Sequence, residues 1–348
     1  MFVGGRELDA NALTKAVYYA DVALPELTRL LAPSAAPALA LPPLAADGSA
    51  LDGVRDLERR CGGRVSLIGV GAELGRTELS LVESILRETR SVMVSLRVRS
   101  WGEEAREAVR LLRELGPSWA DYARLALVLG GDVLTAALPV AAKGEDSFAV
   151  SISALDALKF EGDARRELVG ALLDACSSAA RSGAAAGERV GLRLAWVDAA
   201  LVSGAKLTVP QLIEVLSGLP FYSVGAVSEL ALLSELLKSR LNLKHVRNAG
   251  AFVITYPGDP LLNNYASMEA MTLKDFARLA ASPVIGLDML VIPSWASDEV
   301  LSAFLRDVCY LSALRGGGTF VRLILADAEP GETILVGGHD AVVIEPLM

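Results

Sequence analysis

The sequence predicts an α/β fold in which helices cover a mainly parallel sheet. Short apolar runs rich in β-branched residues alternate along the chain with longer segments whose apolar residues recur at helical spacing. The short runs are apolar at nearly every position, as in strands that are covered on both faces or closed into a barrel. The chain has 348 residues, 52% of them hydrophobic, so it is long enough to bury a large core.

The runs define the expected elements. Nine strands are predicted, at residues 64–70, 91–98, 124–130, 147–153, 190–197, 251–256, 283–293, 319–326 and 341–345, and a tenth is expected near residues 218–226. Seven helices are predicted, at residues 77–90, 103–115, 164–181, 209–216, 227–240, 273–281 and 297–314. Ser297, Asp298 and Glu299 are typical of a helix start, because a capping hydroxyl is followed by acids that favour the positive end of the helix dipole.

Residues 1–60 are predicted to form a helical N-terminal region, and residues 61–348 a single α/β domain. Residues 30–46 are the most apolar stretch, but they contain four prolines, whereas a membrane helix needs about 20 apolar residues with unbroken hydrogen bonding. We therefore expect a Pro/Ala-rich surface connection there and no membrane partner. The first residues also lack the pattern of a signal peptide. Cys61, Cys176 and Cys309 show no Cys-x2-Cys spacing, which favours a reducing, cytoplasmic location.

The charge excludes one class of partner. The net charge is −9 and Lys and Arg are not gathered into runs, so we expect no nucleic-acid partner. A small-molecule ligand and a homo-oligomer both stay open. Gln occurs only at Gln211, and a scarcity of thermolabile amides is consistent with a hot environment as well as with simple composition bias.

A glycine-rich segment resembles a dinucleotide-binding loop. Gly69, Gly71 and Gly75 follow a predicted strand, and Arg97 and Arg99 end the next one, where a 2′-phosphate would be read. The glycine spacing is one residue too long, however, and the next helix begins well after the glycines. An ordinary strand-to-helix loop is favoured, so we expect no tight binding of NAD or NADP, and the cofactor stays unknown.

The sequence gives little support for a transition-metal site. His245 and His339 are the only histidines, and no pair of residues has His-x3-His or Cys-x2-Cys spacing. A hard-cation site built from Asp and Glu stays open.

Four charged residues lie in or just after predicted strands, where α/β folds place their sites. Asp198 and Asp259 follow strands, whereas Asp288 and Arg322 lie inside apolar runs. Each also has a structural interpretation, as a helix cap, a turn residue or a buried ion pair. Because an isolated buried charge costs several kcal/mol, Asp288 and Arg322 are predicted to be neighbours, either in a structural salt bridge or in a site.

The C-terminal third contains an ordered set of short motifs. They are Gly286-Leu287-Asp288-Met289, Pro293, Thr319-Phe320-Val321-Arg322, Pro330-Gly331 and Gly337-Gly338. Upstream, residues 64–96 form a strand–loop–helix–strand segment, and residues 248–259 read "NAGAFVITYPGD". Together these segments resemble the DUF711 family, over roughly residues 60–348.

The resemblance implies a fold similar to the pyruvate-formate-lyase-like barrels, with about ten strands in two five-stranded halves and helices outside. It implies no reaction, because the family has no established activity. The chain departs from the family pattern where members have Cys-Ser-Ser and His-Gly-Thr-Thr, which here read "SVMVSLRVRSW" and "YSVGAVSE". We therefore identify it as a divergent member.

Two functions follow from these observations. The first is a small-molecule enzyme, or its degenerate relative, with Asp288 and Arg322 as charged catalytic groups. Gly337, Gly338 and Asp340 would form a loop over the pocket, and Asp259 and Asp198 would add ligand contacts. The second is a non-catalytic ligand-binding or assembly protein that retains the barrel. Glycyl-radical chemistry is not expected, because the C-terminal glycines match no radical motif and the cysteines fall outside the predicted strands.

Overall fold

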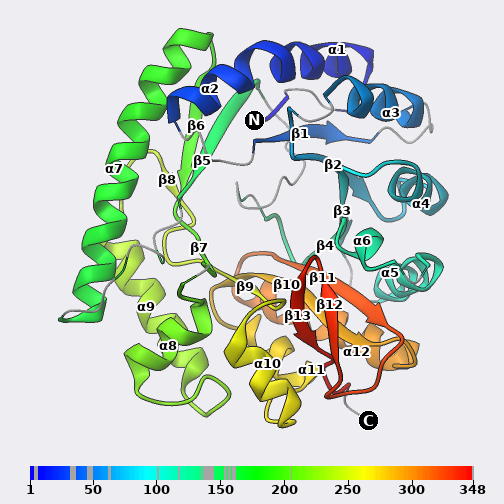
Figure 1. The fold of residues 1–348 in the computed structure, drawn as a ribbon, viewed down its shortest axis with the longest axis vertical. Coiled ribbons are helices and arrows are strands. Elements are labelled where there is room, and N and C mark those ends of the chain that lie inside the picture. Colours follow the sequence, from blue (N-terminus) through cyan, green and yellow to red (C-terminus); the bar gives the residue numbers. More distant parts are fainter. Residues whose placement is uncertain are drawn as a thin grey trace.

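The predicted α/β class is confirmed by the computed structural model, in which parallel strands lie at the centre and helices outside them (Figure 1). The structure describes residues 1–3, 7–31, 37–44, 50–61, 64–99, 102–116, 118–133, 135, 145–152, 155, 158, 162–204 and 206–346. None of the helices within these ranges combines the length and hydropathy needed to span a bilayer.

The larger sheet has eight strands. In spatial order they are β1 (Ala38–Pro43), β2 (Leu67–Glu73), β3 (Val92–Val98), β4 (Leu125–Leu129), β11 (Thr319–Ala326), β10 (Val284–Pro293), β9 (Phe252–Thr255) and β7 (Leu201–Val202). All neighbours are parallel except β4 and β11, which run antiparallel. The sheet therefore consists of two parallel groups that meet at β4 and β11.

A smaller parallel sheet contains β5 (Ser147–Ser151), β6 (Arg193–Asp198) and β8 (Val246–Arg247). Two links connect it to the larger sheet. β6 runs into β7 through residues 199–200, and Phe2 bridges Ser147 at the start of β5 and Ala40 in β1. The bridge includes hydrogen bonds from Phe2 N to Ser147 O at 2.8 Å and from Val3 N to Ala40 O at 2.9 Å.

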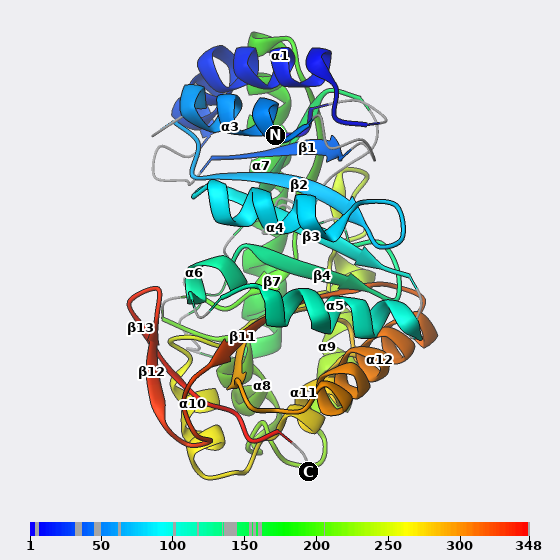
Figure 2. The ribbon, with the colours of Figure 1, turned by 90° about the vertical axis from the view of Figure 1, so that its right-hand side faces the viewer.

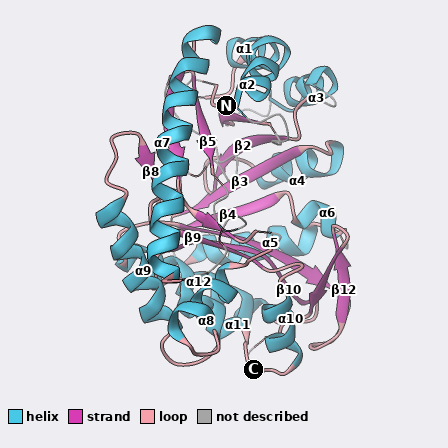
Figure 3. Cartoon of the chain, turned by 60° about the vertical axis from the view of Figure 1, so that its left-hand side comes forward, coloured by secondary structure: helices cyan, strands magenta, loops and turns pink. Residues whose placement is uncertain are grey.

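Helices cover the strands from outside. They are α1 (Ala10–Tyr18), the π-helix η1 (Tyr19–Ala23), α2 (Leu24–Leu31), α3 (Ala50–Cys61), α4 (Leu79–Glu88), α5 (Glu103–Glu114), α6 (Trp119–Tyr122), α7 (Ala164–Val190), α8 (Val209–Ser217), α9 (Ala226–Arg240), α10 (Pro260–Ser267), α11 (Leu273–Leu279) and α12 (Asp298–Leu314). The long helix α7 lies along β6 (Figure 3). The predicted start of α12 is confirmed, because the Ser297 side chain accepts a hydrogen bond from Val300 N.

Three sequence predictions are corrected. Residues 38–43 form the buried strand β1 rather than a surface connection. Residues 218–225 form turns and bends with no strand, and Ala226 begins α9; Gly218 and Gly225 have φ of 69° and 117°, in the left-handed region. The run at 341–345 contributes only its first residues to a strand, β13 (His339–Val342), which pairs with β12 (Thr333–Val336) in a separate hairpin.

The two faces of the larger sheet are packed differently. Val94, Leu127 and Val321 pack in the main core, which also contains apolar residues of the helices. The positions between them along the strands form an inner apolar cluster on the face turned away from the helices. It consists of Met93, Ala126, Val128, Val133, Val253 and Phe320, with Leu67, Val202 and Ile285 at its margin.

Candidate functional site

The predicted contact between Asp288 and Arg322 is confirmed. Arg322 Nη2 donates to Asp288 Oδ2 at 2.8 Å, and Arg322 Nε donates to Asp288 Oδ1. The arginine also donates through Nη1 to the backbone oxygen of Ala123. The two side chains are only 14% and 9% exposed, so this is a nearly buried, two-point ion pair.

A β-bulge in β10 places Asp288 at this position. Leu287 pairs with Val321 and Leu290 pairs with Leu323, so β10 has one more residue than β11 between these pairs. Met289 takes up the extra length with φ of 57°, in the left-handed region that non-glycine residues rarely adopt. The Gly-Leu-Asp-Met motif is therefore the sequence of this bulge.

Neighbouring groups fix the pair further. Thr255 Oγ1 lies 3.5 Å from Asp288 Oδ2, and Tyr256 N donates to the Asp288 backbone oxygen at 2.9 Å. Phe320, two residues before Arg322 on β11, belongs to the inner apolar cluster. The pair thus has the Thr255 hydroxyl on the neighbouring strand β9 and the inner apolar cluster nearby on Arg322's own strand β11.

Asp259 caps α10. Its Oδ1 accepts hydrogen bonds from Leu261 N at 3.0 Å and Leu262 N at 3.1 Å, and Pro260 occupies the first turn of the helix. The side chain is 2% exposed, and burial raises the pKa of this carboxyl above its ordinary value. Oδ1 thus makes the contacts of a helix cap, whereas the buried Oδ2 has no hydrogen-bond partner among the described residues.

Asp198 lies where β6 passes into β7. It is fully buried and accepts hydrogen bonds from Thr135 Oγ1 at 2.5 Å, Asn248 Nδ2 at 2.9 Å and Ala200 N at 3.1 Å. Asn248 has φ of 56°, so its side chain also anchors a left-handed turn. The sequence did not single out either partner: Thr135 stands in no motif, and Asn248 opens the segment "NAGAFVITYPGD" without a spacing that links it to Asp198.

Gly337 and Gly338 form the two-residue turn of the β12–β13 hairpin, with φ of 61° and 85°. Gly337 lies against the Trp119 ring of α6. The backbone oxygen of Asp340 accepts from Gly258 N at 2.8 Å and from Asn263 Nδ2 at 2.9 Å, which docks the hairpin on α10. The hairpin and Arg322 therefore both contact the α6 segment, Arg322 through Ala123. The predicted loop over a pocket stays a prediction.

The three glycines that resemble a dinucleotide loop do not lie together in one loop. Gly69 and Gly71 lie inside β2, and only Gly75 is in the turn before α4. The arginines after them are neutralised, because Arg97 pairs with Asp132 at 2.5 Å and Arg99 pairs with Glu73.

The other side chains that could bind a metal or act as nucleophiles are not grouped together. No group of three or more His, Cys, Asp or Glu side chains suited to a metal occurs in the part of the chain that the structure describes. Cys61, Cys176 and Cys309 are buried at α3, α7 and α12, and burial raises the pKa of each thiol, that of Cys176 to about 11.

Comparison with known proteins agrees with the motifs. A curated relative, a UPF0210 protein of Limosilactobacillus fermentum, is 26% identical over 161 residues, which are 45% of this chain and 36% of the relative. The matched part thus spans about a third of that relative's length. The model of the family described as "Uncharacterised ACR (DUF711)" matches residues 130–335, which include the β10 bulge, Arg322 and most of β12. Because this match covers more than half of the chain, the protein belongs to the DUF711 family.

Proposed function

We propose that this protein is a non-catalytic member of its family, a ligand-binding or assembly protein that retains a pyruvate-formate-lyase-like barrel without barrel chemistry. The observation that carries the proposal is the state of the two charged groups expected to be catalytic. Asp288 and Arg322 bind each other at two points. Both carboxylate oxygens of Asp288 already accept hydrogen bonds from the guanidinium, so neither is left free to take a proton from a substrate.

The links between the two sheets support the barrel. Residues 1–3 and β1 to β4 form five parallel segments, and β5, β6 with β7, β9, β10 and β11 form five more. The groups meet antiparallel at β4–β11 and at the bridge between Phe2 and Ser147. Two parallel halves that run antiparallel to each other can close into one barrel only through two antiparallel junctions, and an antiparallel contact is present at each of the two places.

The absence of glycyl-radical chemistry belongs to the same proposal. Such chemistry requires a thiol close to a glycine on a loop within the barrel. The three cysteines lie on helices, and Gly337 and Gly338 lie at the tip of a hairpin that packs on α6 and α10. These positions favour a protein without a radical site. A cytoplasmic location also stays a prediction.

The test is a conversion assay. The protein is incubated with an extract of small metabolites, and the mixture is followed by mass spectrometry while bound compounds are detected by thermal shift. We expect compounds that raise the melting temperature and none that is consumed. Consumption that scales with protein concentration, is lost in Asp288→Asn and is kept in the exposed control Glu235→Gln would overturn the proposal.

An enzyme with its site at Asp288 is the second candidate, and the bulge favours it. A non-glycine residue at φ of 57° costs about 1–3 kcal/mol, and such strain is concentrated at functional sites. The same assay separates the two candidates, because only the enzyme loses turnover when Asp288 is changed.

A further inference from the structure

Helix α12 carries two apolar stripes, of which one is buried in the main core and the other is partly exposed. Leu301, Leu305 and Val308 are buried in the main core. The opposite, outer stripe follows a spacing of three and four residues and contains Val300, Ala303, Asp307, Tyr310 and Leu314. Four of these five residues are apolar or aromatic, although the outer stripe of a surface helix is ordinarily polar. This spacing is that of a helix that packs against a second helix.

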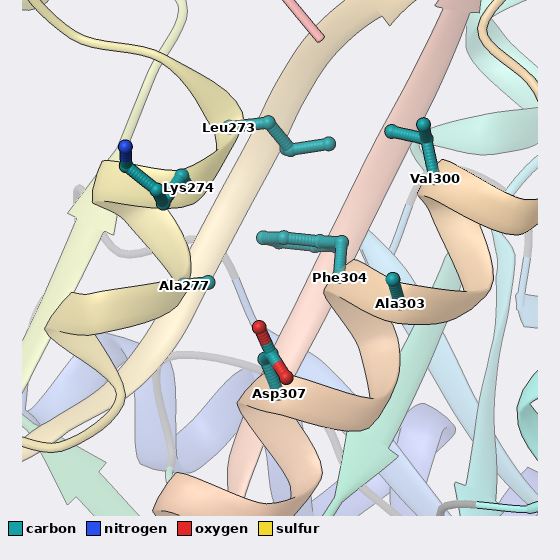
Figure 4. A pocket seen from close by; sticks show the side chains of 7 residues that line it. All are labelled: Leu273, Lys274, Ala277, Val300, Ala303, Phe304 and Asp307. Carbon is teal, nitrogen blue, oxygen red and sulfur yellow. The ribbon is translucent and has the colours of Figure 1, made fainter. Parts of the chain in front are cut away.

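The outer stripe has a hollow part and a projecting part. Near its N-terminal end a cavity of about 250 Å³ lies between α11 and α12, with Leu273, Ala277, Val300, Ala303 and Phe304 as its apolar walls. Leu273 and Phe304 point into the space between the two helices (Figure 4). Near the C-terminal end, Tyr310 and Leu314 stand out from the surface and are 49% and 67% exposed.

Two opposite charges complete the surface. Lys274 of α11 and Asp307 of α12 line the same cavity, and both side chains are exposed. Within the part of the chain that the structure describes, neither has a hydrogen bond or an ion pair. Most other charged groups near α12 are engaged, as in the ion pair between Arg113 and Asp298 at 2.9 Å. Lys274 and Asp307 are thus available to a partner.

We infer that α12 packs antiparallel against α12 of a second copy of this chain, about a two-fold axis near Asp307. Val300 and Leu314 are separated by 14 residues, or about 21 Å along the helix. An antiparallel pairing places the projecting end of each helix opposite the hollow end of the other. Tyr310 and Leu314 of each copy then fill the cavity of its partner.

The charges select the same partner. A two-fold contact brings each surface patch against its own copy, so a patch with one positive and one negative group is complementary to itself. Lys274 of each copy pairs with the partner's Asp307, which also separates the two Asp307 side chains near the axis. A helix pair is a small interface, so we expect a dimer with a dissociation constant in the micromolar range, on the order of 10 µM.

The first experiment is sedimentation velocity on the full chain from about 1 to 200 µM, a range that spans this dissociation constant. Wild type is expected to shift from monomer to dimer, and Leu314→Glu to weaken the dimer at least tenfold. Leu232→Glu is the matched control, because Leu232 lies on α9 and is 63% exposed. It is expected to leave the dimer unchanged. Equal melting temperatures of the two variants as monomers show that each is folded.

The second experiment tests the two-fold axis. Lys274→Glu and Asp307→Lys each place like charges across the interface twice, so each variant alone is expected to be monomeric. An equimolar mixture restores both opposite-charge contacts and is expected to form a heterodimer. A monomeric wild type at 200 µM, equal effects of the two leucine variants or failure of the mixture to associate would each overturn the inference. This dimer does not depend on the proposed function, because neither experiment measures conversion.

Discussion

At the scale of single residues, the Asp288–Arg322 pair shows what burial of charge demands. A carboxylate and a guanidinium in two apolar strands were predictable as neighbours, because leaving either one unpaired costs several kcal/mol. The role of the pair was not predictable, because the same rule holds in a structural ion pair and in a catalytic site. Met289 was not predictable at all, since no periodic pattern marks a left-handed methionine.

The pair predicts strong coupling between two substitutions. Arg322→Met leaves a nearly buried carboxylate without a partner and is expected to lower the free energy of unfolding by about 3 kcal/mol. The double variant Asp288→Asn, Arg322→Met is expected to lose less free energy of unfolding than the two single variants lose together. A double-mutant cycle with urea denaturation measures this difference. The exposed pair Lys238–Glu235 is the control, with a coupling expected near zero. Equal coupling in the two cycles contradicts the prediction.

Asp259 predicts a dependence of stability on pH. Burial raises the pKa of the folded carboxyl, so the folded protein holds this proton more tightly than the unfolded chain does. The free energy of unfolding therefore falls as pH rises above the ordinary Asp pKa of 3.8. Asp259→Asn keeps a capping oxygen and removes the titration. We expect it to stabilise the protein at pH 7 and to bring no gain below pH 3.8; a gain that does not change with pH contradicts this.

At the scale of elements, helix caps and prolines explain which helices and strands were predicted correctly and which were missed. The start of α12 was predictable from Ser297 and the acids that follow it. The short helix α10 was missed, although Asp259 followed by Pro260 is a good signal for a helix start. β1 was missed because its prolines argue against a strand, yet Pro42 and Pro43 lie where the pairing of β1 with β2 is irregular, and such bulges tolerate proline.

The bulge in β10 reverses an ordinary strand preference. Ile is normally favoured over Leu in a strand, but a β-branched side chain is strongly disfavoured at φ of 57°. Met289→Leu is therefore expected to be nearly neutral, and Met289→Ile to cost about 2 kcal/mol. The two variants have the same composition, so chemical denaturation compares the backbone effect directly. A more stable Ile variant would show that position 289 is extended.

At the scale of the whole molecule, the order of the strands in the sheet could not be predicted from the apolar runs. The runs show which residues form strands, but the order β4–β11–β10–β9 depends on contacts between segments far apart in sequence. The same limit applies to the joint between the sheets. Phe2 is 5% exposed, and its ring lies 4.8 Å from that of Trp196, yet no sequence pattern marks residues 1–3 as part of a sheet.

Closure of the proposed barrel would predict slow hydrogen exchange near the N-terminus. The amides of Phe2 and Ser147 are bonded across the junction, to Ser147 O and Phe2 O at 2.8 and 3.2 Å. If this junction closes the barrel, both amides are expected to exchange as slowly as those of β2, because they open only when the sheet opens. Exchange of the Phe2 and Ser147 amides within seconds, beside a protected β2, would show that the barrel is open at this point.

The antiparallel contact of β4 and β11 also has a consequence for synthesis on the ribosome. Leu129 pairs with Thr319, so about 190 residues separate the partners. At about 5–20 residues per second, β11 leaves the ribosome roughly 10–40 s after β4. In that interval one edge of β4, whose five residues are all buried in the finished protein, has no strand to pair with. The growing chain thus exposes an unpaired strand edge until the last third of the chain arrives, whereas in the finished molecule β4 lies between β3 and β11 (Figure 2).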